Sequence, residues 1–277
     1  MSEGKAVRTG RNLPAAAAVG VVLGGAAVVT LFTLKATFLG LVAIAVGVAL
    51  LELSRAFGAR EINLPLVPIA AGGAAMLGLA YWVGQQAALA AFTGTVILLL
   101  AWRLRGGTAG YVRDLTAGIF ALAYLPLLAV FVPLMLARPD GSRRTLIFVA
   151  MAVCSDVGGY FAGILIGRHL MAPGISPKKT WEGFAGSALV CVAGGAILLP
   201  VLLHGRVWQG IILGATAVAA ATLGDLAESM IKRDLDIKDM GAVLPGHGGV
   251  LDRIDSLLVV SPVVWFLLTI FIPHSRR

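Results

Sequence analysis

Apolar runs of about 20 residues, separated by short polar breaks, follow one another along almost the whole chain. A hydrocarbon core about 30 Å thick needs roughly 20 apolar residues per helix, so each run is a candidate spanning helix. The pattern therefore predicts an all-α fold, a polytopic transmembrane helical bundle with about nine spanning helices. They cover residues 13–33, 37–54, 64–83, 87–102, 115–137, 145–167, 184–203, 207–230 and 251–273.

The composition agrees with this pattern and narrows the possible partners. Of the 277 residues, 58% are hydrophobic and 13% are charged, whereas a soluble domain carries about 25% charged residues. The net charge is +8, but the basic residues are scattered between apolar segments and are not gathered on one soluble face. We therefore expect no nucleic acid partner, and we expect membrane lipids and a phosphate-bearing substrate instead.

The basic residues also predict an orientation, because Lys and Arg are retained in cytoplasmic loops. With the N-terminus inside, fifteen of the 22 basic residues fall on the cytoplasmic side, and the group Arg138, Arg143 and Arg144 breaks the trend. The two richest polar segments, 168–183 and 231–255, then share the cytoplasmic face. We expect residues 1–145 to form a lipid-facing scaffold and residues 146–277 a catalytic region in a multi-pass cell (inner) membrane protein.

The segment from Gly224 to Ser256 holds seven of the chain's fourteen carboxylates. A solvated charged loop is one interpretation of such a segment. Asp225, however, directly follows an apolar run, and an ionisable group at that depth normally faces a polar cavity and a partner. Helical spacing of i, i+3, i+4 and i+7 predicts that one helix face carries Asp225, Glu228, Ser229 and Lys232.

Asp252 and Asp255 are spaced i, i+3 at the start of the last predicted helix, with Arg253 between them. Oxygen ligands that converge in this way suit a hard cation such as Mg²⁺. Together with Asp225 on the preceding helix, they predict one metal centre. Compensation of the helix dipole by an N-terminal Asp would explain one of the two carboxylates but not the pair.

Residues 245–249 read PGHGG, in which glycines such as Gly248 and Gly249 allow close backbone approach to a ligand. Successive N–H groups in such a turn can bind an anion. His247 could be a general base, a phosphate donor or a structural hydrogen-bonding residue, and the sequence leaves these three roles open.

A second polar segment begins with Asp156, which stands inside an apolar run and is therefore a candidate site residue. It ends in SPKKTWEG at 176–183, where Lys178 and Lys179 could neutralise a triphosphate or a lipid phosphate. Paired lysines at a membrane face also act as plain topology determinants.

The segment SMIKRDLDIKDMGAVLPGHGGVLDRID resembles the signature of phosphatidate cytidylyltransferases, also called CDP-diglyceride synthases, and SPKKTWEG resembles that family's upstream element. The similarity covers roughly residues 150–260. At 155–160 this chain has SDVGGY where the family more often shows D-T-G-A-Y, so Val157 replaces a hydroxyl while Asp156 and Tyr160 keep their places. The signature residues in register are Ser229, Lys232, Arg233, Lys238, Asp239, Gly241, Pro245, His247, Gly248, Gly249, Asp252, Arg253 and Asp255.

The resemblance implies that CTP and phosphatidic acid give CDP-diacylglycerol and pyrophosphate, in a homodimeric enzyme with Mg²⁺ and a second cation such as K⁺. It assigns Asp225, Asp252 and Asp255 to the metal. The expected catalytic residues are Ser229, Lys232, Asp255 and His247. The expected substrate-binding residues are Asp156, Lys178, Lys179, Arg233, Lys238, Gly248, Gly249 and Arg253.

Two alternatives remain open. A CTP-dependent lipid kinase, such as a polyprenol kinase, would share the nucleotide, the metal and the membrane setting but would release CDP. An ion-coupled transporter would use Asp156, Asp225 and Lys232 as an ion pathway. The full register of the signature favours the cytidylyltransferase, and neither symmetric halves nor broken helices of the transporter type are visible in the sequence.

Overall fold

The computed structural model describes residues 24–241 and 248–273, which are almost entirely helical. The all-α prediction is therefore confirmed. The helices are Gly24–Thr33, α2 (Lys35–Gly58), α3 (Leu66–Trp82), α4 (Gln85–Leu104), α5 (Tyr111–Leu122), α6 (Phe131–Leu136), α7 (Gly141–Ile166), α8 (Trp181–Leu203), α9 (Val207–Asp234) and α10 (Leu251–Phe271), with one π-helical turn, η1 (Ala123–Leu127), between α5 and α6.

All nine predicted apolar segments contain helix in the described residues, and seven spans are long and apolar enough to cross a membrane. The two shorter ones are Gly24–Thr33, whose predicted segment begins outside the described residues, and α3 with 17 residues. Of the nine predicted spanning helices, seven are therefore long enough to span a membrane within the described residues. These spans identify the chain as an integral membrane protein.

The predicted helix 115–137 is one span of 26 residues, Tyr111–Leu136, built from α5, η1 and α6. Pro126 lies inside the π-helical turn, because a proline has no N–H to donate to the helical ladder. Hydropathy alone does not register this local change, since the apolar run continues through it.

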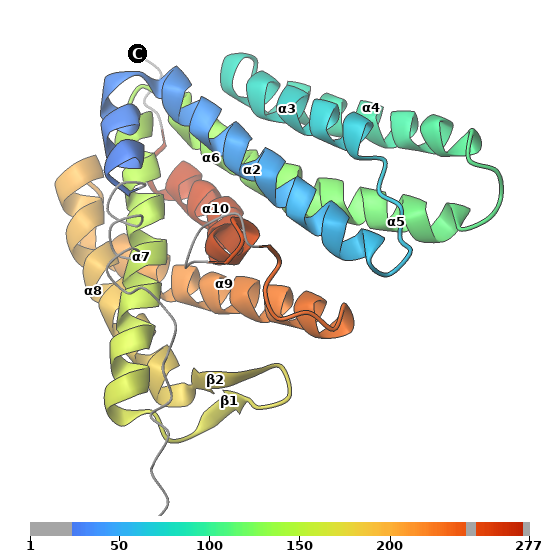
Figure 1. Ribbon diagram of the computed structural model, residues 1–277. Helices are drawn as coiled ribbons and strands as arrows, with labels where there is room; N and C mark the ends of the chain where they lie inside the picture. Colours follow the sequence, from blue (N-terminus) through green and yellow to red (C-terminus); the bar gives the residue numbers. More distant parts are fainter. Residues whose placement is uncertain (1–23, 242–247, 274–277) are drawn as a thin grey trace, which may run out of the picture.

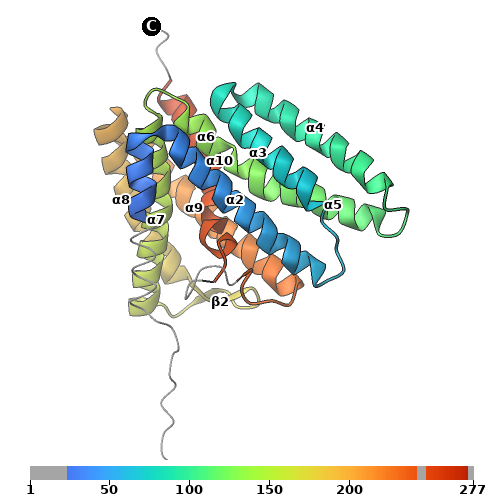
Figure 2. The ribbon, with the colours of Figure 1, turned by 45° about the horizontal axis from the view of Figure 1, so that its top comes forward.

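The helices α7, α8, α9 and α10 pack against one another in chain order, and α3 and α4 form a separate antiparallel pair on the opposite side of the molecule (Figures 1 and 2). Small residues allow the closest approach. A Cβ added to Gly210 on α9 would overlap the carbonyl oxygen of Gly195 on α8. Backbone packing of this kind is typical of helices in lipid.

A small antiparallel sheet, which the sequence did not predict, stands in the polar segment 168–183. It consists of β1 (Leu170–Ala172) and β2 (Ser176–Thr180), with Leu170 opposite Thr180. At its base the Glu182 carboxylate accepts hydrogen bonds from the backbone N–H groups of Arg168 and His169, both at 3.1 Å. The Thr180 hydroxyl oxygen accepts the Gly183 N–H at 3.1 Å and so caps α8. The hairpin is therefore fixed to the first turn of α8.

Candidate active site

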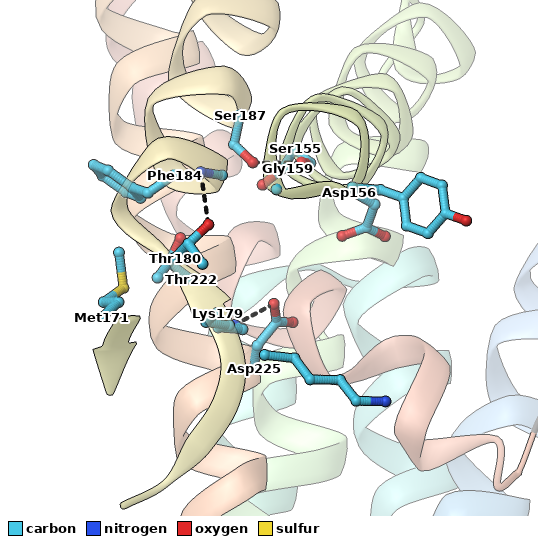
Figure 3. Close-up of a pocket in the computed structure, with 14 residues that line it drawn as sticks. Ser155, Asp156, Gly159, Met171, Lys179, Thr180, Phe184, Ser187, Thr222 and Asp225 are labelled. Atoms are coloured by element: carbon cyan, nitrogen blue, oxygen red, sulfur yellow. Dashed lines mark hydrogen bonds and ion pairs between the residues drawn. The ribbon is translucent and has the colours of Figure 1, made fainter. Parts of the chain in front are cut away.

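Two adjoining cavities lie between α7, the β-hairpin, α8, α9 and α10. Their volumes are about 230 and 610 Å³. They share four lining residues, Asp156 and Tyr160 on α7, Lys179 on β2 and Asp225 on α9. Figure 3 shows the smaller cavity, with Asp156 and Asp225 approaching it from different helices.

The polar face of α9 lines the larger cavity. Asp225, Glu228, Ser229 and Lys232 all contribute to its wall, because the i, i+3, i+4 and i+7 spacing places them on one side of the helix. Asp225 belongs to a 28-residue helix whose earlier turns are apolar, so its carboxylate lies where α9 changes from membrane-spanning to polar. The helix itself thus arranges four polar groups along one cavity.

Lys232 pairs with one carboxylate on its own helix, α9, and with one on α10. Its Nζ lies 2.5 Å from Glu228 Oε2 and 2.9 Å from Asp252 Oδ1. The Glu228 side chain is only 3% exposed, and its second oxygen, Oε1, is buried without a hydrogen-bond partner among the described residues. Such a buried acceptor is costly unless something pairs with it.

Asp252 stands in the first turn of α10 and is held by backbone N–H groups as well as by Lys232. Its Oδ2 accepts hydrogen bonds from Gly249 N at 2.8 Å and from Met240 N at 3.1 Å. One turn later Asp255, 8% exposed, lines the same cavity. Both carboxylates thus face the cavity from one helix end.

Lys179 reaches the site from the hairpin. Its Nζ lies 2.5 Å from Asp225 Oδ2, and this ion pair closes the space between β2 and α9 (Figure 3). Lys178, the neighbouring residue on β2, also lines the smaller cavity. The hairpin therefore brings one positive charge directly against a carboxylate of α9 and a second charge beside it.

The rest of the smaller cavity is lined by short polar and aromatic side chains. Ser187 on α8 donates from Oγ to the Ser155 carbonyl oxygen on α7 at 2.5 Å, and this bond fixes the two helices together. Thr180, Thr222 and Phe184 also line this space. With Tyr160 and Phe184, the cavity therefore offers hydroxyl groups and aromatic side chains, which suit a planar polar ligand.

The charges of the larger cavity favour a cation. Five carboxylates face three basic side chains, Lys179, Lys232 and Arg253, which leaves two formal negative charges in excess; the carboxylates are Asp156, Asp225, Glu228, Asp252 and Asp255. In the described part of the chain no three such groups already form a metal-ligand cluster. Mg²⁺, however, is usually held by one or two carboxylates together with waters and substrate phosphates. The side chains present therefore fit Mg²⁺ bound with a nucleotide.

Some of the predicted site residues lie away from both cavities. Arg233 donates from Nε to the Ile175 carbonyl oxygen at 3.2 Å, at the tip of the hairpin, and like Lys238 it lines neither cavity. Gly248 and Gly249 do not line them either; Gly249 N–H bonds to Asp252. His247 and its predicted roles lie outside the described residues.

Other contributors were not assigned from the sequence. Glu228 is the buried partner of Lys232, although its i+3 spacing from Asp225 was already visible. Ser155, Ser187 and Thr222 were too generic to single out without the fold. Glu52 on α2 holds the start of α10 from a distance of about 200 residues in sequence. An ionisable residue inside an apolar run was the signal that could have found it.

Comparison with known proteins identifies the family of this chain. The model of the cytidylyltransferase family matches residues 15–271. A phosphatidate cytidylyltransferase of Mycobacterium leprae is 42% identical over 280 residues, covering 95% of this chain and 89% of the relative. One of Mycobacterium bovis is 39% identical, covering 95% and 90%, and one of Brucella suis is 37% identical over 134 residues, covering 48% and 50%. The resemblance found in the signature segment is thereby confirmed: the chain belongs to the cytidylyltransferase family and is a nucleotidyltransferase of the membrane.

Proposed function

We propose that this protein is a phosphatidate cytidylyltransferase. A phosphate oxygen of phosphatidic acid attacks the α-phosphorus of CTP, the bond from that phosphorus to the β-phosphate oxygen breaks, and CDP-diacylglycerol and pyrophosphate form. The match to proteins of that name over 95% of the chain supports this reaction, and the mixed charges of the cavity supply its chemistry.

The observation that carries the proposal is the alternation of carboxylates and lysines within one cavity between spanning helices. Lys179 pairs with Asp225, and Lys232 pairs with both Glu228 and Asp252. A magnesium nucleotide offers a cation to such carboxylates and phosphates to such lysines at the same time. Transfer of a phosphoryl-type group depends mainly on positioning and charge stabilisation of this kind.

The two cavities suit the two substrates. The smaller cavity, with its hydroxyl groups and Phe184, would take the cytidine, and the shared wall at Asp156, Lys179 and Asp225 would take the phosphates. The larger cavity would take the lipid phosphate, because it is bordered on α7 by Val157 and Phe161, whose side chains are 45% and 59% exposed. Exposed apolar groups beside a polar cavity suit a substrate with two acyl chains.

Six of the eight charged residues that line the larger cavity then have a defined role. Asp225 and Asp252 would hold Mg²⁺, with Asp255 beside them, and the metal when bound supplies charge neutralisation on the transferring phosphate. Lys179, Lys232 and Arg253 bind phosphate oxygens, to which Arg offers a planar fork of donors. A phosphate monoester is largely ionised at neutral pH, so its oxygen attacks without a strong base on the enzyme. No covalent enzyme intermediate is required.

The setting of the reaction follows from the distribution of basic residues. We place the active site on the cytoplasmic face of the cell (inner) membrane, because the hairpin segment and the loop after α9 belong to the two polar segments richest in basic residues. A homodimer and a second cation such as K⁺ stay predictions of the family resemblance.

The test is an assay of the purified protein in liposomes that contain phosphatidic acid, with α-labelled CTP and Mg²⁺. We expect labelled lipid and an equal amount of pyrophosphate, loss of both on addition of EDTA, and recovery with Mg²⁺. Asp252→Asn should abolish turnover. The matched control is Asp114→Asn, which alters a carboxylate 2% exposed on α5, a helix that lines neither cavity.

The other outcomes separate the alternatives. Release of labelled CDP without labelled lipid would identify a lipid kinase. Absence of any nucleotide turnover by the folded protein, with several divalent metals, would refute the enzymatic proposal. Equal loss of turnover in Asp114→Asn and Asp252→Asn would show that the assay reports folding and not the site.

A further inference from the structure

Glu52 is a buried carboxylate in the C-terminal part of an apolar helix. It belongs to α2, its side chain is 1% exposed, and the helix buries Ala49, Leu53 and Ala56 beside it. A carboxylate in such surroundings is strongly disfavoured unless hydrogen bonds or a positive charge compensate for the lost water. Its partners therefore indicate what it does.

Those partners are the first backbone N–H groups of α10. Glu52 Oε1 accepts from Val250 N at 3.0 Å, and Oε2 accepts from Leu251 N at 2.9 Å. The early N–H groups of a helix have no acceptor within the helix, and the positive end of the helix dipole lies there. One carboxylate of α2 thus satisfies two donors at the start of the helix that carries Asp252 and Asp255.

The same carboxylate also shapes the loop before α10. A Cβ on Gly241 would lie 2.5 Å from Glu52 Oε1 and 2.7 Å from its Cδ, and a Cβ on Gly249 would lie 2.7 Å from Oε2. Glycine is needed at both positions because the backbone passes directly over Glu52. Gly249, held in this way, donates its N–H to Asp252 Oδ2 at 2.8 Å.

A second contact fixes the other side of the loop to the end of α2. Arg60 donates from Nε and Nη2 to the Leu235 carbonyl oxygen, at 3.0 and 2.8 Å, just after α9 ends. Leu235 and Met240 are both 5% exposed, so these two side chains anchor the loop, whereas Asp236, Lys238 and Asp239 between them are exposed. The C-terminal part of α2 therefore holds the connection between the two helices that line the larger cavity.

We propose that Glu52 is a positioning residue for cytidylyl transfer, acting through the start of α10. It lines neither cavity; it fixes the N–H groups and the glycine backbone that orient Asp252. Groups that orient a metal ligand in this way commonly change metal affinity or activity by about 10- to 100-fold when removed. This inference rests on the proposed function, since it assigns Asp252 to the metal.

The principal variant is Glu52→Gln, which keeps the side-chain volume. Its amide oxygen can accept one N–H, but its NH₂ group then faces the other donor, and the negative charge at the helix end is lost. We expect binding of Mn²⁺, used as a spectroscopic substitute for Mg²⁺ and followed by electron paramagnetic resonance, to weaken about 10- to 100-fold. The Mg²⁺ concentration for half-maximal turnover should rise in parallel. Amide hydrogen exchange in residues 248–256 should become faster.

Gly241→Ala provides a second route to the same contact, because all three atoms nearest to the added methyl group belong to Glu52. It should reproduce the weaker Mn²⁺ binding and the faster exchange. The double variant Glu52→Gln/Gly241→Ala should bind Mn²⁺ no more weakly than the more severe single variant, since both changes disrupt one interaction. Gly241→Ala also keeps the test available if Glu52→Gln does not fold.

Asp114→Asn is the control, because Asp114 is an equally buried carboxylate that pairs with Arg103 at 2.9 Å and lies outside this loop. It should lower stability but leave Mn²⁺ affinity unchanged. The inference is refuted if Glu52→Gln binds Mn²⁺ and exchanges its 248–256 amides as the wild type does, whatever its stability. A wild type that binds Mn²⁺ but makes no labelled lipid would instead refute the proposed function.

Discussion

Lys232 is the side chain whose removal should most disturb the charge balance of the site. Its Nζ is the hydrogen-bond partner of Glu228 Oε2 at 2.5 Å and also contacts Asp252 Oδ1 at 2.9 Å. The three side chains are 17%, 3% and 8% exposed. Lys232→Met keeps most of the aliphatic stem and removes the charge, so the two carboxylates lose their shared cation.

The expected cost falls mainly on Glu228. Asp252 keeps the N–H groups of Gly249 and Met240, whereas Glu228 keeps no hydrogen-bond partner among the described residues. Removing one member of a buried ion pair costs about 3 to 5 kcal/mol, because the other charge stays buried. We therefore expect Lys232→Met to lower the free energy of unfolding by that amount and to abolish cytidylyl transfer.

A compensating change separates the stability effect from the catalytic one. Adding Glu228→Gln removes the uncompensated charge and leaves a neutral amide, whose unsatisfied burial costs about 1 to 3 kcal/mol. The double variant should therefore regain about 2 kcal/mol over Lys232→Met while staying inactive. Equilibrium unfolding in mixed detergent micelles, followed by circular dichroism, measures both differences.

Lys35→Met is the matched control for this cycle, because Lys35 donates to the carbonyl oxygens of Arg138 and Pro139 and, within residues 24–241 and 248–273, to no carboxylate. Its loss should cost about 1 kcal/mol, the value of an ordinary hydrogen bond. The reasoning is refuted if Lys232→Met is no more destabilising than this control, or if Lys232→Met/Glu228→Gln is no more stable than Lys232→Met alone.

Three further predictions concern packing, capping and substrate binding. Gly210→Ala should destabilise the protein by about 1 to 3 kcal/mol, because the methyl group would overlap the Gly195 carbonyl. Gly47→Ala, which meets nothing within 4 Å, should be neutral or stabilising in the same unfolding assay, and an equal loss in both would contradict the packing argument. Thr180→Ala should lower the free energy of unfolding by about 1 kcal/mol through loss of the α8 cap, and Thr180→Ser, which keeps the hydroxyl, should retain most of that stability. Lys179→Ala should raise the KM for CTP about tenfold through loss of one charged hydrogen bond, and an unchanged KM in steady-state assays would remove Lys179 from the phosphate site.

The helical framework could be predicted from the sequence because its signal is local. Each spanning helix must bury about 20 apolar residues, so hydropathy alone locates it, and the expected segment 207–230 corresponds to α9 within a few residues. The π-helical turn at Ala123–Leu127 changes the backbone without changing the apolar pattern, so hydropathy passes over it. The hairpin was missed because strand pairing between Leu170–Ala172 and Ser176–Thr180 leaves no alternating pattern in so short a segment.

In the candidate site, too, local features could be predicted from the sequence, whereas contacts between distant segments could not. The helical spacing from Asp225 to Lys232 could be read directly, because one helix face is a local property. The contact of Glu52 with Val250 spans 198 positions and depends on how α2 packs, which no local pattern records. Likewise Gly248 and Gly249 were interpreted as residues that allow close backbone approach to a ligand. The structure places the Glu52 and Asp252 carboxylates close to Gly249, where a side chain would otherwise lie.

The charge arrangement explains why a reaction of phosphates can take place among spanning helices. Isolated charges in apolar surroundings cost several kcal/mol each, and close pairing with an opposite charge reduces that cost. Lys179 and Lys232, drawn from the hairpin and from α9, each compensate at least one carboxylate. In the proposed reaction, a substrate complex that carries both a divalent cation and phosphates would place the cation at the carboxylates and the phosphates at the lysines. We therefore propose that the site favours a metal nucleotide over either component alone, since only the complex would pair both the carboxylates and the lysines.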